Sequence, residues 1–256
     1  MLRRNAEIHL TRFAPFGSNP AETDSQATVA CSWCCLQDVC LACGLNGRAR
    51  APLDDLVTTK RRIAKERSVY RSGERFEFLY AVRSGAFKSV AHSLHGDEKV
   101  VGFHLPRDVL GLDAISTGRH GYGAVALEDS EVCAIPFAAL TKLSLAKPML
   151  QRQILHMLSG DICRDQGLML LLGNMAAEQR LAAFLLSLSD RYHRLGFAAD
   201  RFVLRMTRDE IGSYLGLTLE TVSRVLSRLQ GQGLIGVHQR EIELKEAGTL
   251  RDLVGR

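Results

Sequence analysis

The most informative part of this 256-residue chain is the stretch at 207–230, which reads TRDEIGSYLGLTLETVSRVLSRLQ. Thr207 and Glu210 have the spacing of a capping box, in which the threonine hydroxyl accepts an amide hydrogen and the glutamate reaches back. Gly216 can end this short helix, and Thr218 can cap a second helix that runs to the end of the stretch. Two short helices joined by a glycine turn predict a helix-turn-helix.

The second helix has one apolar and one polar face. Its inner face is formed by Val222, Val225, Leu226 and Leu229. The residues expected to meet DNA are Thr218, Glu220, Ser223, Arg224, Ser227 and Arg228. Arg224 can donate two hydrogen bonds to guanine, Glu220 can accept from a cytosine amino group, and Ser223 can bond a base or a phosphate. Alternatively, Glu220 and Arg224 form an ordinary surface ion pair.

Two apolar segments follow, at 234–237 and 241–244, and they flank the polar residues 238–240. This pattern predicts a two-stranded wing beside the helix-turn-helix. A further helical run is predicted at 178–186, before the helix-turn-helix. The C-terminal part of the chain is therefore expected to bind DNA.

A long helix is predicted from Pro148 to Leu172, because proline suits the first turn and no other proline follows in this stretch. A spacing of three and four residues, typical of a coiled-coil seam, links Leu155, Leu158, Ile162, Asp165, Met169 and Leu172. These residues are expected to form the interface of a homodimer. Alternatively the stripe packs against the protein's own β domain. A second apolar set could serve that contact instead: Leu150, Ile154, Met157, Leu168 and Leu171.

Residues 53–147 contain short apolar or alternating runs that glycine-bearing turns separate. Such spacing predicts an antiparallel β barrel or roll. The composition, with 46% hydrophobic and 24% charged residues, is that of an ordinary globular chain with one or two domains. The net charge of +5 suits an anionic partner. No apolar stretch is long enough to span a membrane and no signal peptide is recognisable, so we expect a cytoplasmic protein.

Five of the seven cysteines fall within thirteen residues: Cys31, Cys34, Cys35, Cys40 and Cys43. In a reducing compartment such a cluster favours metal binding or redox chemistry over disulfides. Cys31-x2-Cys34 with Cys40-x2-Cys43 could bind zinc, and Cys35-x4-Cys40-x2-Cys43 has the spacing of plant-type ferredoxins. Cys163, in the long helix, is expected to be a small apolar filler. Motifs of serine hydrolases, nucleotide-binding loops and metal–histidine sites are absent from the sequence, so we predict that the protein is not an enzyme.

Residues 217–224, LTLETVSR, resemble the recognition helix of the FNR branch of the CRP/FNR transcription regulators. The resemblance continues at 165–172 and 178–184, and in the β region at 96–105 and 132–137. It implies an α+β protein with a jelly-roll β domain like that of cyclic-nucleotide binders. The implied segments are a cysteine-bearing segment (1–47), the β-roll sensory domain (48–147), the dimerisation helix (148–173) and the winged helix-turn-helix domain (174–256).

The same resemblance implies a [4Fe-4S] cluster, because the oxygen-sensing members carry three cysteines spaced C-x2-C-x5-C and a fourth in the β domain. Here Cys31, Cys34 and Cys40 have that spacing, and Cys133 occupies the fourth place. Thiolates are the ligands that such clusters require. The alternative for Cys133 is a buried cysteine of a β-strand.

The family resemblance also implies how the protein acts. Without oxygen, a homodimer would place two recognition helices about 34 Å apart in successive major grooves of palindromic DNA, with half-sites like TTGAT and ATCAA. Loss of the cluster in oxygen would loosen the dimer and release the DNA.

The turn with Gly96, Asp97 and Glu98 matches a surface that touches RNA polymerase in the family, which implies activation of anaerobic genes. A solvated acidic turn is the alternative. Cyclic nucleotide is a further candidate effector, but the phosphate cradle of such binders is missing around 111–113 and 122–125. Arg119 and His120 are nearby and do not fit its pattern.

Overall fold

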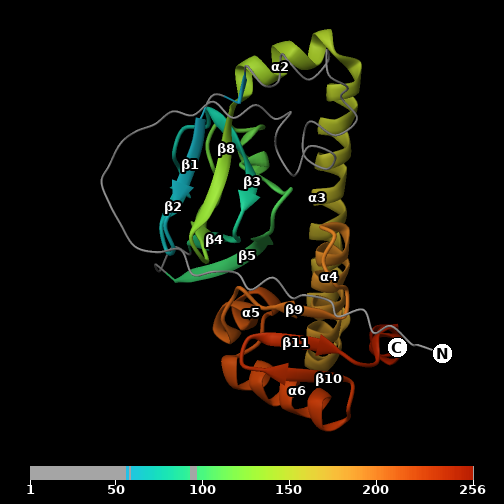
Figure 1. The fold of residues 1–256 in the computed structure, drawn as a ribbon. Coiled ribbons are helices and arrows are strands. Elements are labelled where there is room, and N and C mark those ends of the chain that lie inside the picture. Colours follow the sequence, from blue (N-terminus) through green and yellow to red (C-terminus); the bar gives the residue numbers. More distant parts are fainter. Residues whose placement is uncertain (1–55, 58, 93–96, 256) are drawn as a thin grey trace, which may run out of the picture.

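The computed structural model describes residues 56–57, 59–92 and 97–255. It consists of a β-roll, a long helix that runs beside the roll, and a C-terminal unit at the lower end of that helix (Figure 1). This confirms the predicted α+β architecture with an antiparallel β domain, a long helix and a winged helix-turn-helix. The predicted cysteine-bearing segment, residues 1–47, lies outside the described residues.

The β-roll is built from two four-stranded antiparallel sheets. Its strands are β1 (Thr59–Ile63), β2 (Ser68–Tyr70), β3 (Phe78–Ser84), β4 (Phe87–His92), β5 (Glu98–His104), β6 (Val109–Leu110), β7 (Gly123–Ala126) and β8 (Ser130–Pro136). One sheet has the order β1-β8-β3-β6 and the other has the order β2-β7-β4-β5. A short 3-10 helix, η2 (Leu112–Ala114), follows β6.

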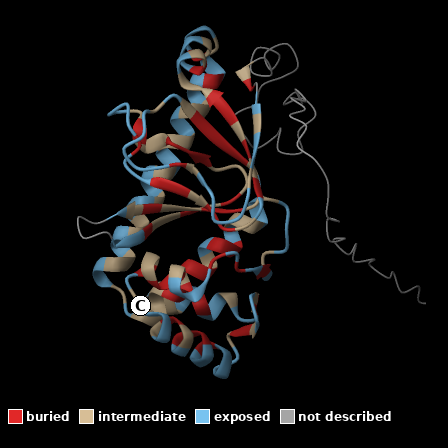
Figure 2. Cartoon of the chain, turned by 90° about the vertical axis from the view of Figure 1, so that its left-hand side faces the viewer, coloured by how far each residue is buried: buried red, intermediate tan, exposed pale blue. Residues whose placement is uncertain are grey.

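Strand β8 shows why these sequences form a two-layered roll. Its residues alternate between two faces, as expected for a strand. Val132 and Ala134 are buried between the sheets, whereas Cys133 and Ile135 belong to a second apolar cluster on the outer face of the sheet. Figure 2 shows the buried residues gathered between the sheets and inside the C-terminal unit.

Two helices follow β8, namely α2 (Phe137–Ala146) and α3 (Pro148–Asn174). Helix α2 corrects the prediction that residues up to 147 continue the pattern of β-strands. Its Leu140 and Leu143 pack into the outer apolar cluster with Phe137. This contact joins segments that are distant in the sequence, so the ten residues of the helix alone do not predict it. Pro148 begins α3 as predicted, and the helix ends two residues beyond Leu172.

The C-terminal unit contains α4 (Ala177–Arg194), β9 (Arg201–Val203), α5 (Arg208–Leu215), α6 (Leu219–Gly231), β10 (Ile235–His238), β11 (Glu241–Leu244) and α7 (Ala247–Val254). Strands β10 and β11 are the predicted wing, and β9 extends it to a three-stranded sheet of order β10-β11-β9. In the described part of the chain, no helix combines the length and apolar character required to cross a membrane.

The β-roll and the C-terminal unit share one hydrophobic core. Val100, Phe103 and Leu105 from the end of the roll belong to the same buried cluster as the inner faces of α4, α5 and α6. The ring of Phe103 lies 5.9 Å from that of Phe184 on α4 and 5.1 Å from that of Tyr214 on α5. The helix-turn-helix is therefore docked directly on the roll.

Candidate DNA interface and sensory residues

The helix-turn-helix is held by the local signals that its sequence predicts. The amide of Glu210 donates to Thr207 Oγ1 (3.2 Å), and the amide of Thr207 donates to Glu210 Oε2 (2.7 Å), which confirms the capping box. Gly216 ends α5 in the left-handed conformation at φ 64°, which favours glycine. The amide of Thr221 donates to Thr218 Oγ1 (3.2 Å), so Thr218 caps α6.

Helix α6 presents most of the predicted DNA-contacting side chains to solvent. Its apolar face is buried through Val222, Val225, Leu226 and Leu229. The exposed residues are Thr218, Glu220, Arg224, Ser227 and Arg228. Ser223 departs from the prediction of a solvent-facing side chain, because it is half-buried and its hydroxyl accepts a hydrogen bond from Arg208 (3.2 Å). Its position between the two helices of the motif explains this contact.

Two basic residues of the helix-turn-helix have partners on neighbouring helices. Arg208, on α5, was not predicted as a site residue, although its position directly after the cap places an exposed cation next to α6. Arg228 lies 3.5 Å from Glu178 of α4, and its side chain remains 63% exposed. Among the described residues, no ion pair joins Glu220 to Arg224; Arg224 instead donates to Thr221 Oγ1 at 3.4 Å. Arg224 is thus available to a ligand.

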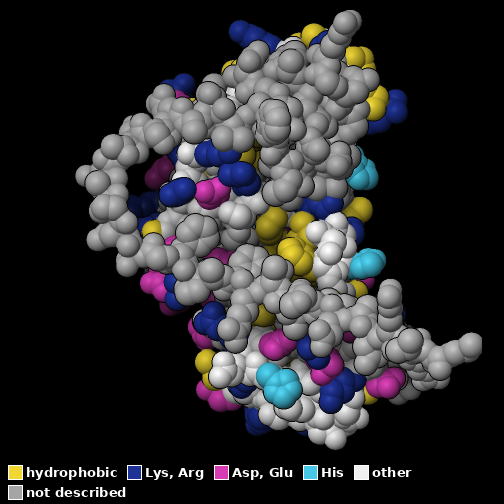
Figure 3. Space-filling model, in the orientation of Figure 1, with side chains coloured by type: hydrophobic (Ala, Val, Ile, Leu, Met, Phe, Trp, Pro, Cys, Tyr) yellow, Lys and Arg dark blue, Asp and Glu magenta, His cyan; other side chains and the backbone are white. Residues whose placement is uncertain are grey.

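The electrostatics of this face are mixed. Hydrogen bonds to its own backbone amide and to the Thr218 side chain lower the pKa of Glu220, so the residue is an anion at neutral pH. Figure 3 shows acidic and basic side chains interspersed over the visible face of the C-terminal unit. Glu220 and Arg224 can discriminate between bases through individual contacts, because a carboxylate and a guanidinium recognise different base edges.

Helix α3 carries an exposed apolar line on one side. Leu155, Ile162 and Met169 are seven residues apart and are 59%, 56% and 71% exposed. Asp165 is exposed, whereas Leu158 and Leu172 are half-buried.

The opposite side of α3 packs against the roll through Leu150, Ile154 and Met157, which confirms the role considered for these three residues. Leu168 packs against the core that the roll and the C-terminal unit share. The two apolar sets of this helix therefore face different surroundings.

Cys133 lies on β8 opposite Lys60 of β1 and Ala81 of β3, and it is half-buried. It packs in the outer apolar cluster, where Leu56 and Val57 also lie. Cys31, Cys34, Cys35, Cys40 and Cys43 fall outside the described residues. The expectation of an apolar filler role for Cys163 is wrong, because its side chain is exposed on the surface of α3.

Of the predicted polymerase contact, Gly96 falls outside the described residues, whereas Asp97 and Glu98 are exposed. The ammonium of Lys88 lies 2.9 Å from Glu98 and 3.1 Å from Glu210, so it links this turn to the capping box of α5. Burial disfavours the charged lysine, but the two carboxylates together raise its pKa.

The region where a cyclic nucleotide would need phosphate donors contains a carboxylate instead. The amides of Gly121 and Tyr122 both donate to Asp113 Oδ2, at 2.7 and 3.3 Å. The Arg119 guanidinium donates to the Gly73 carbonyl (2.8 Å), and His120 is buried. An anion at Asp113 opposes phosphate binding, so these residues do not form a phosphate cradle.

Comparison with known proteins identifies the architecture. Residues 179–253 match the Crp-like helix-turn-helix domain, and residues 60–146 match the cyclic nucleotide-binding domain. The transcriptional regulatory protein btr of Bordetella pertussis is 42% identical over 226 residues, which cover 88% of this chain and 93% of that protein. The fumarate nitrate reduction regulatory protein of Klebsiella oxytoca is 42% identical over 228 residues, which cover 89% and 91%.

Among solved structures, FixK2 from Bradyrhizobium japonicum is similar with a TM-score of 0.70 and 36% identity, over 76% of this chain and 96% of that one. These similarities extend from the β-roll through the helix-turn-helix, and they confirm the prediction that the chain is not an enzyme. The chain therefore belongs to the CRP/FNR family of DNA-binding transcription regulators.

Proposed function

We propose that this protein is a homodimeric transcription regulator that senses oxygen through a [4Fe-4S] cluster held by Cys31, Cys34, Cys40 and Cys133. The observation that carries this proposal is the position of Cys133, half-buried on the face of β8 that lies toward α2 and α3. The relatives named as fumarate and nitrate reduction regulators support a role in anaerobic gene expression.

The surroundings of Cys133 fit a ligand that connects two parts of the chain. Leu56 and Val57 pack in the same cluster as Cys133, so the N-terminal segment joins the roll beside this thiol. Residues 44–55 can span up to about 40 Å when fully extended, so the upstream cysteines can reach Cys133. When bound, the iron–sulfur cluster would be held by four thiolate–iron bonds and would supply reactivity toward oxygen.

The apolar side chains around Cys133 also connect this thiol to the helix expected to form the dimer interface. Ile154 and Met157 of α3 pack in the same apolar cluster as Cys133. A displacement of β8 would therefore shift the contacts of this helix. The other side of α3 exposes Leu155, Ile162 and Met169, which a second copy would cover in a parallel two-fold pair. Two recognition helices about 34 Å apart would then read an inverted repeat such as TTGAT and ATCAA.

Anaerobic purification followed by iron and acid-labile sulfide analysis tests the cofactor directly. Iron and sulfide in equal amounts, lost in air together with affinity for the inverted repeat, are the expected result. Tightly bound zinc without sulfide would contradict the proposal and favour a structural metal site instead.

Replacement of Arg224 by alanine tests base reading. We expect a loss of roughly 1–3 kcal/mol at the best site and a relaxed preference at one base pair of each half-site, because a bidentate guanine contact disappears. Titration of a set of singly substituted sites measures both effects. Arg251→Ala, which removes an exposed arginine of α7, is the control. Equal weakening at all sequences would make Arg224 a phosphate contact.

Replacement of Asp165 by alanine tests the dimer. Arg164 bonds Asp108 and Asp161, and Arg180 donates to backbone carbonyls, so neither arginine neutralises Asp165. A two-fold pair would oppose two Asp165 carboxylates that lose water on association. We therefore expect Asp165→Ala to strengthen dimerisation by on the order of 1–3 kcal/mol and to permit DNA binding in air.

Sedimentation of wild type and mutant under air measures this change. Asp190→Ala, at an exposed position of α4, is the matched control. An unchanged or weaker dimer of the Asp165 mutant would remove this residue from the switch.

We also propose that the turn of Gly96, Asp97 and Glu98 contacts RNA polymerase. Asp97 and Glu98 are exposed and acidic, which suits a basic partner surface. Their position beside α5, through Lys88, would place the polymerase contact next to the bound DNA.

A further inference from the structure

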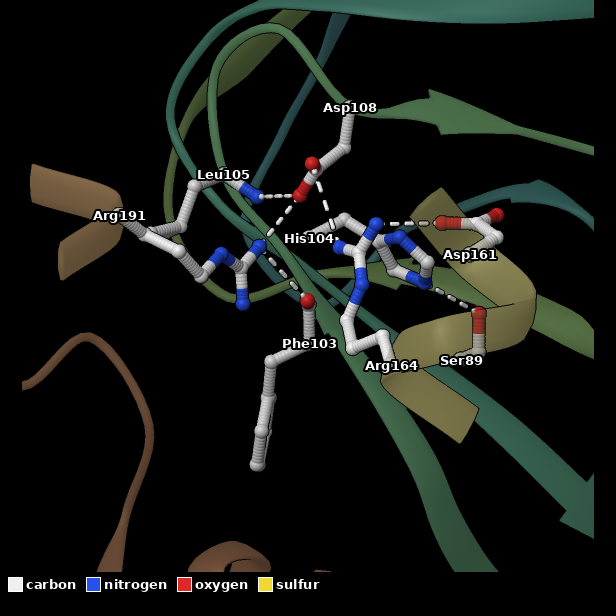
Figure 4. A network of polar contacts seen from close by, with 8 residues as sticks. All are labelled: Ser89, Phe103, His104, Leu105, Asp108, Asp161, Arg164 and Arg191. Carbon is white, nitrogen blue, oxygen red and sulfur yellow. Dashed lines mark hydrogen bonds and ion pairs between the residues drawn. The ribbon is translucent and has the colours of Figure 1, made fainter. Parts of the chain in front are cut away.

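A single carboxylate, Asp108, joins three parts of the molecule (Figure 4). It lies in the turn between β5 and β6, where the Leu105 amide donates to its Oδ2 atom (2.8 Å). Arg164 of α3 donates to Oδ1 (3.3 Å), and Arg191 of α4 donates to Oδ2. Asp108 thus connects the β-roll to α3, the helix with the exposed apolar line, and to α4, the helix that packs against α6.

Both arginines have a second anchor. Arg191 also donates to the Phe103 carbonyl (3.0 Å), and its side chain is only 12% exposed. Arg164 also binds Asp161 on its own helix, one turn away. Because each guanidinium is held at two points, its orientation is fixed along with its distance from Asp108.

The charge of Asp108 is secured by its surroundings. Burial disfavours the carboxylate, but Arg191 and Arg164 together lower its pKa below the usual value. The neighbouring His104 is neutral at pH 7, because burial lowers its pKa to about 4, and it bonds Ser89 (2.7 Å). Burial raises the pKa of Asp161 to about 6. Asp108 is therefore an anion, and it is the carboxylate that both arginines bond.

The two helices that Asp108 bonds meet at a short, non-helical junction. Helix α3 ends at Asn174 and α4 begins at Ala177, so only Met175 and Ala176 connect them. Both residues are extended, with ψ near 144° and 158°. Two extended residues interrupt the helical hydrogen bonds, and the angle between the helices then depends on side-chain contacts across the junction.

We propose that Asp108 is a positioning residue that sets which spacing between DNA half-sites the dimer accepts. This inference rests on the proposed two-fold dimer at an inverted repeat. In that dimer α3 lies along the two-fold axis and α4 carries the recognition helix, so the angle between them determines how far apart the two recognition helices lie. A change of one base pair moves a half-site by about 3.4 Å and turns it by about a tenth of a helical turn.

The test compares wild type with Asp108→Asn, as anaerobically purified full-length proteins, on inverted repeats whose half-sites are at the best spacing or one base pair closer or farther. The measured quantity is the ratio of affinities for the best and the shifted sites. A general loss of stability cancels in this ratio. We expect the ratio to fall about tenfold in the mutant, as for loss of a charge-assisted hydrogen bond, while the base preference within each half-site stays.

The matched control is Glu131→Gln. Glu131 is also a carboxylate bonded by two arginines, Arg62 (3.3 Å) and Arg83 (2.7 Å), but all three lie within the β-roll. Its spacing ratio should equal that of wild type. If Asp108→Asn fails to fold, Arg164→Gln must lower the ratio instead, because it removes the tie between Asp108 and α3 and leaves the tie to Arg191 of α4.

The outcomes separate the two proposals. Equal spacing ratios in wild type and in the Asp108 and Arg164 variants would overturn the role of Asp108. Failure of wild type to bind any inverted repeat would instead overturn the proposed function.

Discussion

Replacement of Cys133 by serine is expected to abolish the anaerobic iron–sulfur absorbance of the purified protein. The hydroxyl of serine is a poor ligand for cluster iron at neutral pH, whereas the thiolate of cysteine is the required donor. Cys133 is half-buried on β8, and serine is close to it in size, so the β-roll itself should remain folded. Absorbance, iron content and far-ultraviolet circular dichroism of the same preparation measure these effects.

Cys163→Ser is the matched control, because Cys163 is an exposed cysteine of α3 that the proposal leaves without a role. Its absorbance should equal that of wild type. Replacement of Cys31, Cys34 or Cys40 should behave like Cys133→Ser, whereas replacement of Cys35 or Cys43 should spare the cluster. Full absorbance in Cys133→Ser would show that the fourth ligand lies elsewhere in the chain.

Replacement of Gly212 by alanine is expected to reduce specific DNA binding by on the order of 100-fold, through overpacking of the turn and displaced base contacts. An added Cβ would lie 2.7 Å from the Leu217 carbonyl oxygen and 3.4 Å from the carbonyl carbon of Thr218. Both are backbone atoms of the segment between α5 and α6, which cannot rotate away as a side chain can. Helix α6 would have to shift relative to α5.

Gly231→Ala provides the control for this prediction, since a Cβ at Gly231 meets nothing within 4 Å. Alanine there, at the end of α6, should leave DNA binding unchanged. Electrophoretic mobility shifts with one palindromic and one scrambled duplex measure specific and non-specific affinity. If Gly212→Ala binds as wild type does, the close packing of α5 against the turn is not required for recognition.

The elements with local signals were predictable from the sequence. The caps at Thr207 and Thr218 and the glycine at 216 each act within four residues, and the structure contains all three. The alternation along β8 and the proline at the start of α3 are equally local. Sequence spacing therefore specified the helix-turn-helix, the wing and the long helix.

The elements that depend on distant contacts were not predictable in the same way. Strand β9 has three residues and exists because it pairs with β11. Helix α2 is stabilised by packing on the outer face of the roll. The partial burial of Ser223 follows from Arg208, fifteen residues away. The contacts of Asp108 join residues 56 and 83 positions apart, and no short pattern encodes them.

The contact of Phe103 with Phe184 and Tyr214 bears on how such regulators can diversify. The C-terminal unit looks like a cassette that recombination could transfer to another sensor, but its apolar surface is completed by the end of β5. A chimaera that kept α4 and α5 without Phe103 would leave two aromatic rings facing water. Successful exchange therefore requires the recipient β-roll to supply a large apolar side chain at the same place. This requirement limits the sensor domains to which the C-terminal unit can be joined.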